Sequence, residues 1–300
     1  MSKFSTWMSA FRLRTLPLSL SGIILGTCFA AFNSSFNTLI FVLALLTTIS
    51  FQILSNLAND YGDGVKGTDN ENRIGPERAL QSGEISANQM LTAIKINIGV
   101  SIVLAGTLIY VAFGIEHLPY VFLFLVLAIA SIYAAMKYTM GSSAYGYRGL
   151  GDVFVFLFFG LLGVLGSYFL YTYAIDPIVI SPAICLGLLS VGVLNLNNMR
   201  DIESDKLSHK MTLAVKLGLK KAKIYQLLLV GGSMILTSVF IYFYYQSWKN
   251  LFVFITFLPL IKHMIFVYKT NKNKLFDPQL KVLALSTFFF SIALGLGFVL

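Results

Sequence analysis

Long apolar segments recur along this chain, and they restrict its fold more than any other feature. Each is about 20 residues long, the length that an α-helix needs to cross the hydrocarbon core of a bilayer. Only 12% of the residues are charged, which excludes a soluble domain. Because lipid cannot satisfy unpaired backbone groups, we predict an all-α polytopic membrane protein with a single transmembrane domain, residues 1–300. The nine expected spans are Leu16–Phe32, Thr38–Leu57, Met90–Phe113, Leu118–Met136, Asp152–Tyr171, Pro177–Asn195, Ile224–Tyr245, Leu251–Tyr268 and Leu280–Leu300.

The basic residues predict how these spans are oriented. If the connections are assigned to alternate sides, the N-terminus and the loops after spans two, four, six and eight hold every Lys and Arg except Lys249. The positive-inside rule then places the N-terminus and these loops in the cytoplasm, and the C-terminus outside the inner (plasma) membrane. The net charge of +9 is explained by this topology and by attraction to anionic lipid, and its spread along the chain argues against nucleic-acid binding.

Acidic residues cluster at two places, where the second and the sixth span reach the predicted cytoplasmic side. The first cluster lies in NLANDYGDGVKGTD and the second in NLNNMRDIESD. Carboxylates at membrane depth are costly and are usually functional. Residues three or four apart share a helix face, so each cluster forms a polar stripe that begins with Asn-x-x-x-Asp. The stripes are Asn56, Asp60 and Asp63, and Asn197, Asp201 and Asp205.

Two such stripes facing each other across a cavity would form a metal site. Carboxylate and amide oxygens are the ligands that Mg²⁺ prefers, and Mg²⁺ usually binds a few carboxylates together with substrate phosphates. We therefore predict that Mg²⁺ bridges the aspartates to a diphosphate, whose departure it would assist. The basic residues near the clusters would neutralise the remaining charge. These residues are Lys66, Arg73, Arg78, Lys137, Arg148, Arg200 and Lys210.

These motifs resemble a known family. NxxNDYxDxxxGxD at Asn56–Asp69 and NNxRDIxxD ending at Asp205 are similar to the two aspartate motifs of the UbiA superfamily of intramembrane prenyltransferases. Four further segments resemble the branch of that superfamily that prenylates 1,4-dihydroxy-2-naphthoate in menaquinone biosynthesis. They are RTLPLS, RIGPERAL, YRGLGDVFVFLFFG and KMTLAVKLG. The resemblance covers essentially the whole chain. One departure is His209, which stands where we expect glycine before Lys210.

The resemblance implies a bundle of nine helices around a central cavity, with Mg²⁺ between the motifs and a cytoplasmic cap made of the loops after spans two and six. The implied substrates are an allylic polyprenyl diphosphate and dihydroxynaphthoate. The allyl cation would attack the naphthoate ring, which loses its carboxylate and a proton to give demethylmenaquinone. No obligate protein partner is evident beside the lipid bilayer.

The resemblance also implies roles for individual residues. The implied Mg²⁺ ligands are Asn56, Asp60, Asp63, Asp69, Asp201 and Asp205. The expected contacts to diphosphate or to the carboxylate of the acceptor come from Asn197 and from the basic residues named above. Tyr138 would face the carbocation or the aromatic acceptor.

Other functions remain open at this point. Within the superfamily, the acceptor could be 4-hydroxybenzoate or a haem precursor. A secondary transporter could also carry acidic residues in two matching helices, but it would place them near the bilayer midplane, whereas these lie at helix ends.

Overall fold

The computed structural model describes residues 3–69 and 74–300, and every regular element within them is a helix. In that described part, nine helical stretches are long and apolar enough to cross a membrane, which confirms the predicted all-α polytopic fold. The elements are α1 (Lys3–Phe11), η1 (Leu13–Thr15), α2 (Leu16–Phe32), α3 (Thr38–Val65), α4 (Ala87–Phe113), α5 (Leu118–Lys137), η2 (Tyr145–Arg148), α6 (Gly151–Val155), η3 (Phe156–Gly166), α7 (Ser167–Thr172), α8 (Pro177–Arg200), α9 (Ile202–Leu207), α10 (Leu213–Tyr244), η4 (Trp248–Thr256), α11 (Phe257–Lys269), η5 (Asn273–Phe276) and α12 (Asp277–Val299).

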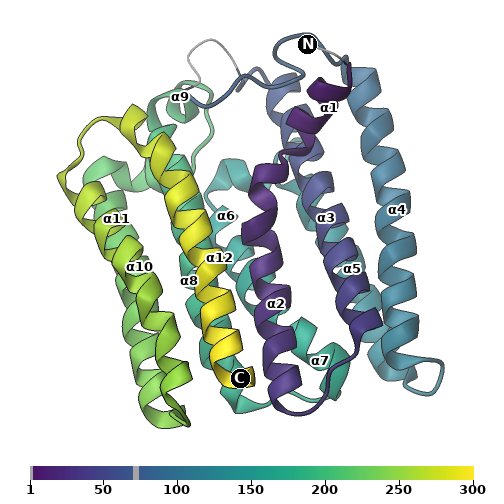
Figure 1. Cartoon of the computed structure of the whole chain (residues 1–300). Helices are drawn as coiled ribbons and strands as arrows, with labels where there is room; N and C mark the ends of the chain where they lie inside the picture. Colours follow the sequence, from purple (N-terminus) through teal and green to yellow (C-terminus); the bar gives the residue numbers. More distant parts are fainter. Residues whose placement is uncertain (1–2, 70–73) are drawn as a thin grey trace.

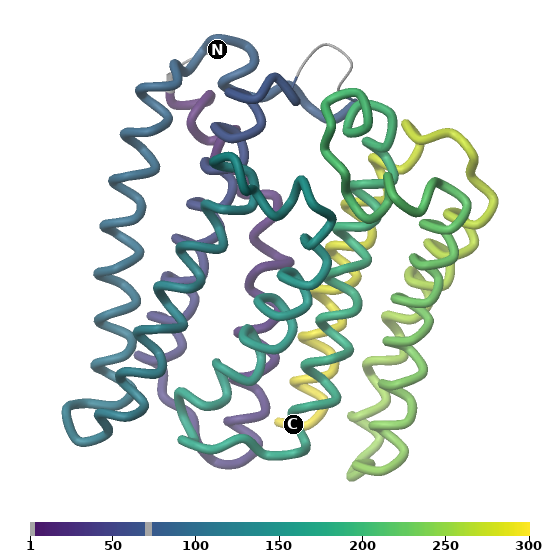
Figure 2. The backbone as a smooth tube through the Cα atoms, turned by 180° about the vertical axis from the view of Figure 1, so that it is seen from behind, coloured from purple at the N-terminus to yellow at the C-terminus, as the bar shows by residue number. Residues whose placement is uncertain are grey.

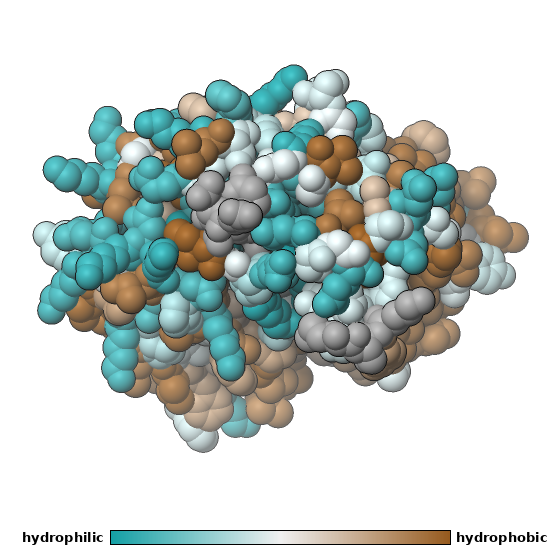
Figure 3. Space-filling model, turned by 90° about the horizontal axis from the view of Figure 1, so that it is seen from above, coloured by the Kyte–Doolittle hydropathy of each residue, from teal (hydrophilic) through white to brown (hydrophobic). Residues whose placement is uncertain are grey.

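The long helices lie side by side in a bundle (Figures 1 and 2). The N-terminus and the short helix α9 lie at one end of the bundle, and the C-terminus lies at the other end (Figure 1). Seen from the end that carries the N-terminus, hydrophilic side chains cover much of the surface (Figure 3). We call this end the polar end. The two acidic motifs belong to helices that finish there.

Helix α8 lies in the main core of the bundle and carries the second acidic motif at its end. Its apolar residues Leu186, Leu189 and Leu196 are fully buried. Small residues allow close packing on one side: a Cβ added to Gly160 of η3 would lie 2.5 Å from the Cα of Gly187. Glycine is therefore needed at this crossing, as is common where membrane helices pack closely. The close packing fixes the position of α8 beside the cavity described below.

Helix α3 carries the first acidic motif, and its ends follow from local sequence. The Asn37 side chain caps its start by accepting hydrogen bonds from the backbone N–H groups of Leu39 and Ile40, at 2.9 and 3.2 Å. Shortly after the helix ends, Gly67 adopts φ +71°, a conformation that glycine reaches without steric cost. The chain turns there and leaves Asp60 and Asp63 in the last turns of the helix.

Several helices continue further toward the polar end than the predicted spans. Helix α3 ends at Val65, beyond the predicted limit at Leu57, and α8 ends at Arg200, beyond Asn195. Hydropathy set the predicted limits, but backbone hydrogen bonding continues through the polar turns that follow. A second difference is η3, a π-helix within the fifth span, which apolar composition does not predict.

Candidate active site

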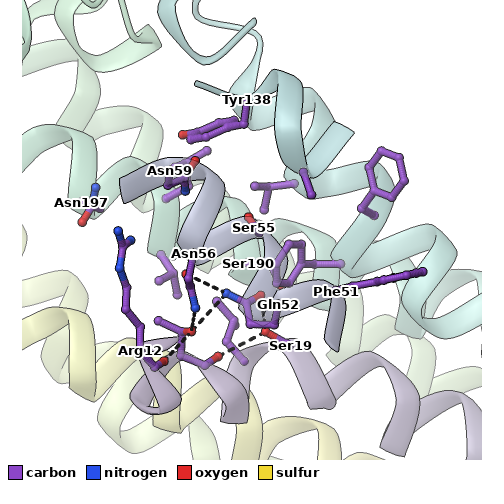
Figure 4. A pocket seen from close by; sticks show the side chains of 18 of the residues that line it. Arg12, Ser19, Phe51, Gln52, Ser55, Asn56, Asn59, Tyr138, Ser190 and Asn197 are labelled. Carbon is purple, nitrogen blue, oxygen red and sulfur yellow. Dashed lines mark hydrogen bonds between the residues drawn. The ribbon is translucent and has the colours of Figure 1, made fainter. Parts of the chain in front are cut away.

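A cavity of about 1280 Å³ opens inside the bundle, and both acidic motifs line it. Its walls come from the N-terminal turn and from α2, α3, α4, α5, η3, α8 and α12. Toward the polar end the lining is acidic, basic and amide side chains, several of which appear in Figure 4. Further along the helices the lining becomes apolar, with Ala44 of α3 and Leu108 and Ile109 of α4. One cavity thus joins a charged chamber to an apolar one.

The first motif is buried at the polar end of α3. Asn56, Asp60 and Asp63 all line the cavity, and none is more than 4% exposed. Their spacing of four and then three residues along one helix gives them a common face. Asp69 follows in the loop, also lines the cavity, and lies 3.8 Å from the guanidinium of Arg78.

Asp63 is held by side chains from two distant segments. The Lys210 ammonium lies 3.0 Å from Asp63 Oδ2, and the Tyr147 hydroxyl donates to Asp63 Oδ1 at 2.8 Å. Tyr147 also forms a hydrogen bond with Thr68. The Lys66 ammonium lies 4.1 Å from the centre of the Tyr147 ring. The loops after α3, α5 and α9 therefore meet at Asp63. Thr68 and Lys210 support the cap expected over the site, and Tyr147 adds a third loop to it.

Electrostatics at this contact favour a charged lysine. Burial alone would lower the pKa of Lys210, but the carboxylates of Asp63 and Asp205 outweigh burial and raise it. Burial, followed by the charge of Asp63, raises the pKa of Tyr147. The lysine therefore carries its positive charge into the site, while the tyrosine remains a neutral hydrogen-bond donor.

The second motif is organised by Arg200, the last residue of α8. Its guanidinium forms a fork with Asp201, from Nε to Oδ1 at 2.8 Å and from Nη2 to Oδ2 at 2.6 Å. It also donates to Asn197 Oδ1 at 3.0 Å and to Asp277 of α12 at 2.5 Å. Arg200 is only 3% exposed, so it joins α8 to α12 inside the protein.

The second stripe is not one uninterrupted helix. Asp201 stands at the junction between α8 and α9, and Asp205 lies in α9. The four-residue spacing is still preserved, because Asp201 N–H bonds to Asn197 O and Asp205 N–H bonds to Asp201 O. Asn197, Asp201 and Asp205 all line the cavity.

The carboxyl of Asp205 shows that the two motifs act on each other. Its pKa is raised to about 7, first by burial and then by the negative charges of Asp201 and Asp63, against the opposing effect of Lys210. No hydrogen-bond donor reaches this carboxylate from the part of the chain that the structure describes. Negative charge from both motifs is thus concentrated in one chamber with incomplete neutralisation, an arrangement that a bound cation would stabilise.

Asn56 has a second set of contacts. Its amide nitrogen donates to Phe11 O at 2.9 Å and to Thr15 Oγ1 at 3.2 Å, and its oxygen accepts a long hydrogen bond from Gln52 at 3.3 Å (Figure 4). Gln52 in turn accepts from Ser19 at 2.6 Å. Asn56 therefore fixes the N-terminal turn against α3. Its amide nitrogen donates to that turn, and its amide oxygen accepts from Gln52.

The basic residues predicted for the site divide into two groups. Arg78, Arg200 and Lys210 line the cavity. Lys66, Lys137 and Arg148 do not: Lys66 donates to Thr139 O at 2.6 Å, and Arg148 is exposed. Arg73 lies outside the described residues.

Tyr138 lines the cavity at the end of α5 (Figure 4). Its ring packs edge-on against that of Tyr145. Burial raises its pKa to about 12, so it is neutral at physiological pH.

Sequence reasoning did not single out several further polar residues at the cavity, and it gave no role to Tyr147, which holds Asp63. RTLPLS contains Arg14 and YRGLGD contains Tyr147, but the identity of a residue in a motif does not show which way its side chain points. The cavity residues in question are Arg12, Arg14, Asn59, Asn198, Asp277 and Lys281.

Fold and site together define a membrane-embedded enzyme of the prenyltransferase class. The family model described as the UbiA prenyltransferase family matches residues 19–297, and the chain therefore belongs to this family.

Individual relatives narrow the comparison. The 1,4-dihydroxy-2-naphthoate octaprenyltransferase of Haemophilus influenzae is 43% identical over 98% of this chain and 96% of its own length. The protein of the same name from Escherichia coli is 45% identical over 84% of this chain and 82% of its own. A UbiA homologue from Archaeoglobus fulgidus, solved bound to DMAPP and Mg²⁺, shares the fold with a TM-score of 0.65 and 14% identity, covering 96% of this chain and 98% of its own.

Proposed function

We propose that this chain is an Mg²⁺-dependent aromatic prenyltransferase that transfers a polyprenyl group from an allylic polyprenyl diphosphate to 1,4-dihydroxy-2-naphthoate. The observation that carries this proposal is one cavity with two buried acidic motifs at its polar end and apolar walls beyond them. Such a cavity suits a substrate with a diphosphate head and a hydrocarbon tail. The naphthoate acceptor is supported by the names of the relatives that are 43% and 45% identical.

The donor set fits Mg²⁺. In the described residues, no three His, Cys, Asp or Glu side chains form a ready-made metal cluster. The acidic groups are hard oxygen donors, however, and the raised pKa of Asp205 marks negative charge that a divalent cation would stabilise. Bound Mg²⁺ would supply charge stabilisation for the departing diphosphate. The residues that would hold it are Asp60, Asp63, Asp201 and Asp205, with Asn56, Asp69 and Asn197 at the edges of the site.

The remaining side chains position the substrates. Arg78 and Lys210 line the charged chamber and neutralise diphosphate oxygens that the metal leaves free. Arg200 acts mainly by orienting Asp201 and Asn197. Tyr138 presents a neutral ring to the carbocation or to the acceptor. Lys66, Lys137 and Arg148 do not line the cavity, so we assign them no substrate contact.

Electron balance defines the first product. The carbon–oxygen bond to diphosphate breaks, a carbon–carbon bond to the ring forms, and the ring releases its carboxylate as CO₂. None of these steps removes electrons from the ring, so the product is formed at the quinol level. Demethylmenaquinone then arises by a separate two-electron oxidation.

We further propose that the whole chain acts as one domain and that its polar end faces the cytoplasm at the inner membrane, with the C-terminus outside.

The proposal is tested with membranes that contain this chain and no other prenyltransferase. They are incubated with a polyprenyl diphosphate and 1,4-dihydroxy-2-naphthoate, with Mg²⁺ or with excess EDTA, and products are identified by mass spectrometry. We expect a prenylated naphthoquinol only with Mg²⁺. A parallel incubation with 4-hydroxybenzoate tests the acceptor, and Glu116→Gln, an exposed acid away from the cavity, serves as the control variant. Full activity in EDTA, or preference for 4-hydroxybenzoate, would contradict the proposal.

A further inference from the structure

Seven lysines gather on one side of the polar end. Helix α11 packs against both α10 and α12, which brings the polar ends of the three helices together. Hydrophilic side chains are densest on the left of Figure 3, the side on which Figure 1 shows α10 and α11. We call this group the α10–α12 lysine patch. It consists of Lys220, Lys221, Lys262, Lys269, Lys272, Lys274 and Lys281.

Few acidic residues lie near the patch. Glu203 of α9 lines a small pocket together with Lys272 and Lys274 and offsets part of their charge. Between Lys206 and the C-terminus the only acidic residue is Asp277, and Arg200 occupies its carboxylate. Within the described ranges, no side-chain hydrogen bond or ion pair engages any lysine of the patch. Two lysines near the first acidic motif differ, since Lys210 contacts Asp63 and Lys66 contacts Thr139 O. The patch therefore presents free ammonium groups to its surroundings.

The patch lies directly above a lipid-facing surface. On α10, Lys220 is followed at four-residue intervals by Ile224 and Leu228, which are 58% and 67% exposed. On α11, Lys269 follows Tyr268, which is 69% exposed. An exposed apolar stripe of this kind faces acyl chains, and a tyrosine with lysines at its end marks the headgroup level. The ammonium groups thus stand where lipid phosphates are found.

We propose that the α10–α12 lysine patch binds the headgroup phosphate of an anionic phospholipid from the surrounding bilayer. The lysines supply several point charges to the phosphate, and the stripe of Ile224 and Leu228 lies beside its acyl chains. The ligand is a lipid rather than a free anion because phosphate attraction and apolar contact are offered together. Of the seven lysines, only Lys281 lines the cavity that holds the acidic motifs, and lipid binding does not depend on the identity of the prenyl acceptor.

The test uses the full chain in nanodiscs of phosphatidylcholine that contain a trace of fluorescent phosphatidylglycerol. Lys220, Lys221, Lys269, Lys272 and Lys274 are replaced together by Gln, and by Arg in a matched control that keeps the charge. Lys281 is left unchanged because it lines the cavity. The measurement is the amount of phosphatidylglycerol retained by the protein at rising salt. We expect retention to weaken by roughly fivefold per lysine removed, to stay near wild type in the Arg control, and to fall as salt screens the patch.

Several outcomes would overturn the proposal. Retention in the Gln variant equal to that of wild type would show that the patch does not bind the lipid. Competition by inorganic phosphate or diphosphate as effective as competition by phosphatidylglycerol would show a free-anion site. Selective displacement by a polyprenyl diphosphate would instead assign the patch to the substrate. Prenyl transfer by the Gln variant at saturating substrate reports that it is folded, since none of the five lysines lines the cavity.

Discussion

The two acidic motifs line one cavity, but the protein stabilises them differently. At the first motif, Asp63 depends on Lys210 and Tyr147, which arrive from other loops. At the second motif, Asp201 is held by Arg200, its neighbour in sequence, at the buried end of α8. Asp201 is therefore fixed at one helix end, whereas Asp63 is held only when the loops at the polar end close over it. This difference predicts which substitutions damage the fold and which damage the site alone.

Loss of Arg200 is expected to have the largest effect on stability. Arg200→Ala leaves Asp201 without its partner inside the protein and breaks the connection to Asp277. Removing one member of a buried pair typically costs about 3–5 kcal/mol. Thermal unfolding in detergent or nanodiscs measures the loss, with Lys210→Met as the comparison. We expect Lys210→Met to cost less, because Asp63 keeps the Tyr147 hydroxyl; an equal loss in both variants would remove the distinction between the motifs.

Magnesium affinity is expected to depend on pH through Asp205. The pKa of this carboxyl is raised from 3.8 to about 7, so a proton must leave before a cation binds at lower pH. Affinity should fall about tenfold for each pH unit below about pH 7 and level off above it. Between pH 3.8 and about 7, Asp205 is protonated more fully in the folded state than in the unfolded state. The metal-free protein should therefore lose stability as pH rises through this range.

Titration of thermal stability with Mg²⁺ at several pH values measures both effects. In Asp205→Asn the titrating group is absent, so the pH dependence of affinity should be much reduced. An unchanged dependence in that variant would assign the proton to another residue.

A smaller effect is expected from Tyr147→Phe, which removes the hydroxyl that binds Asp63 and Thr68. A hydrogen bond to a charged group contributes about 1.5–3 kcal/mol, so kcat/KM should fall by roughly 10- to 150-fold. Tyr173→Phe is the matched control, because its hydroxyl donates to Ala112 O outside the cavity. Activity of Tyr147→Phe at the level of this control would show that the loop contact does not organise the site.

The smallest effect is expected at His209. This residue has φ +54°, in the left-handed region, which glycine adopts without steric cost. Glycine is the residue that the family resemblance led us to expect at this position. His209→Gly should raise the unfolding free energy by at most about 1 kcal/mol, because relief of strain is partly offset by greater freedom of the unfolded chain. Thermal unfolding and prenyl transfer measure the outcome; a clear loss of stability would mean that the imidazole makes contacts that outweigh the strain.

Sequence patterns predicted the spans well because apolar length is a local property. They also indicated the spacing of Asp60 and Asp63, since helix periodicity follows from the chain itself. They could not show that Lys137 and Arg148 lie outside the cavity lining, or that Tyr147 reaches Asp63, because these positions depend on how separate loops fold against one another. The π-helix η3 was also missed, since its hydropathy is that of an ordinary span.

The central claim is that the two motifs form one metal–diphosphate site, and a double-mutant comparison tests it most directly. Prenyl transfer is measured at matched protein level for wild type, Asp60→Ala, Asp201→Ala and the double variant. Each single variant should lose at least about 100-fold in rate, as expected for preorganised electrostatic groups. Because groups that act as a unit are not additive, the double variant should be little worse than the poorer single variant. Near wild-type rates in either single variant, or losses that multiply in the double, would contradict a single shared site.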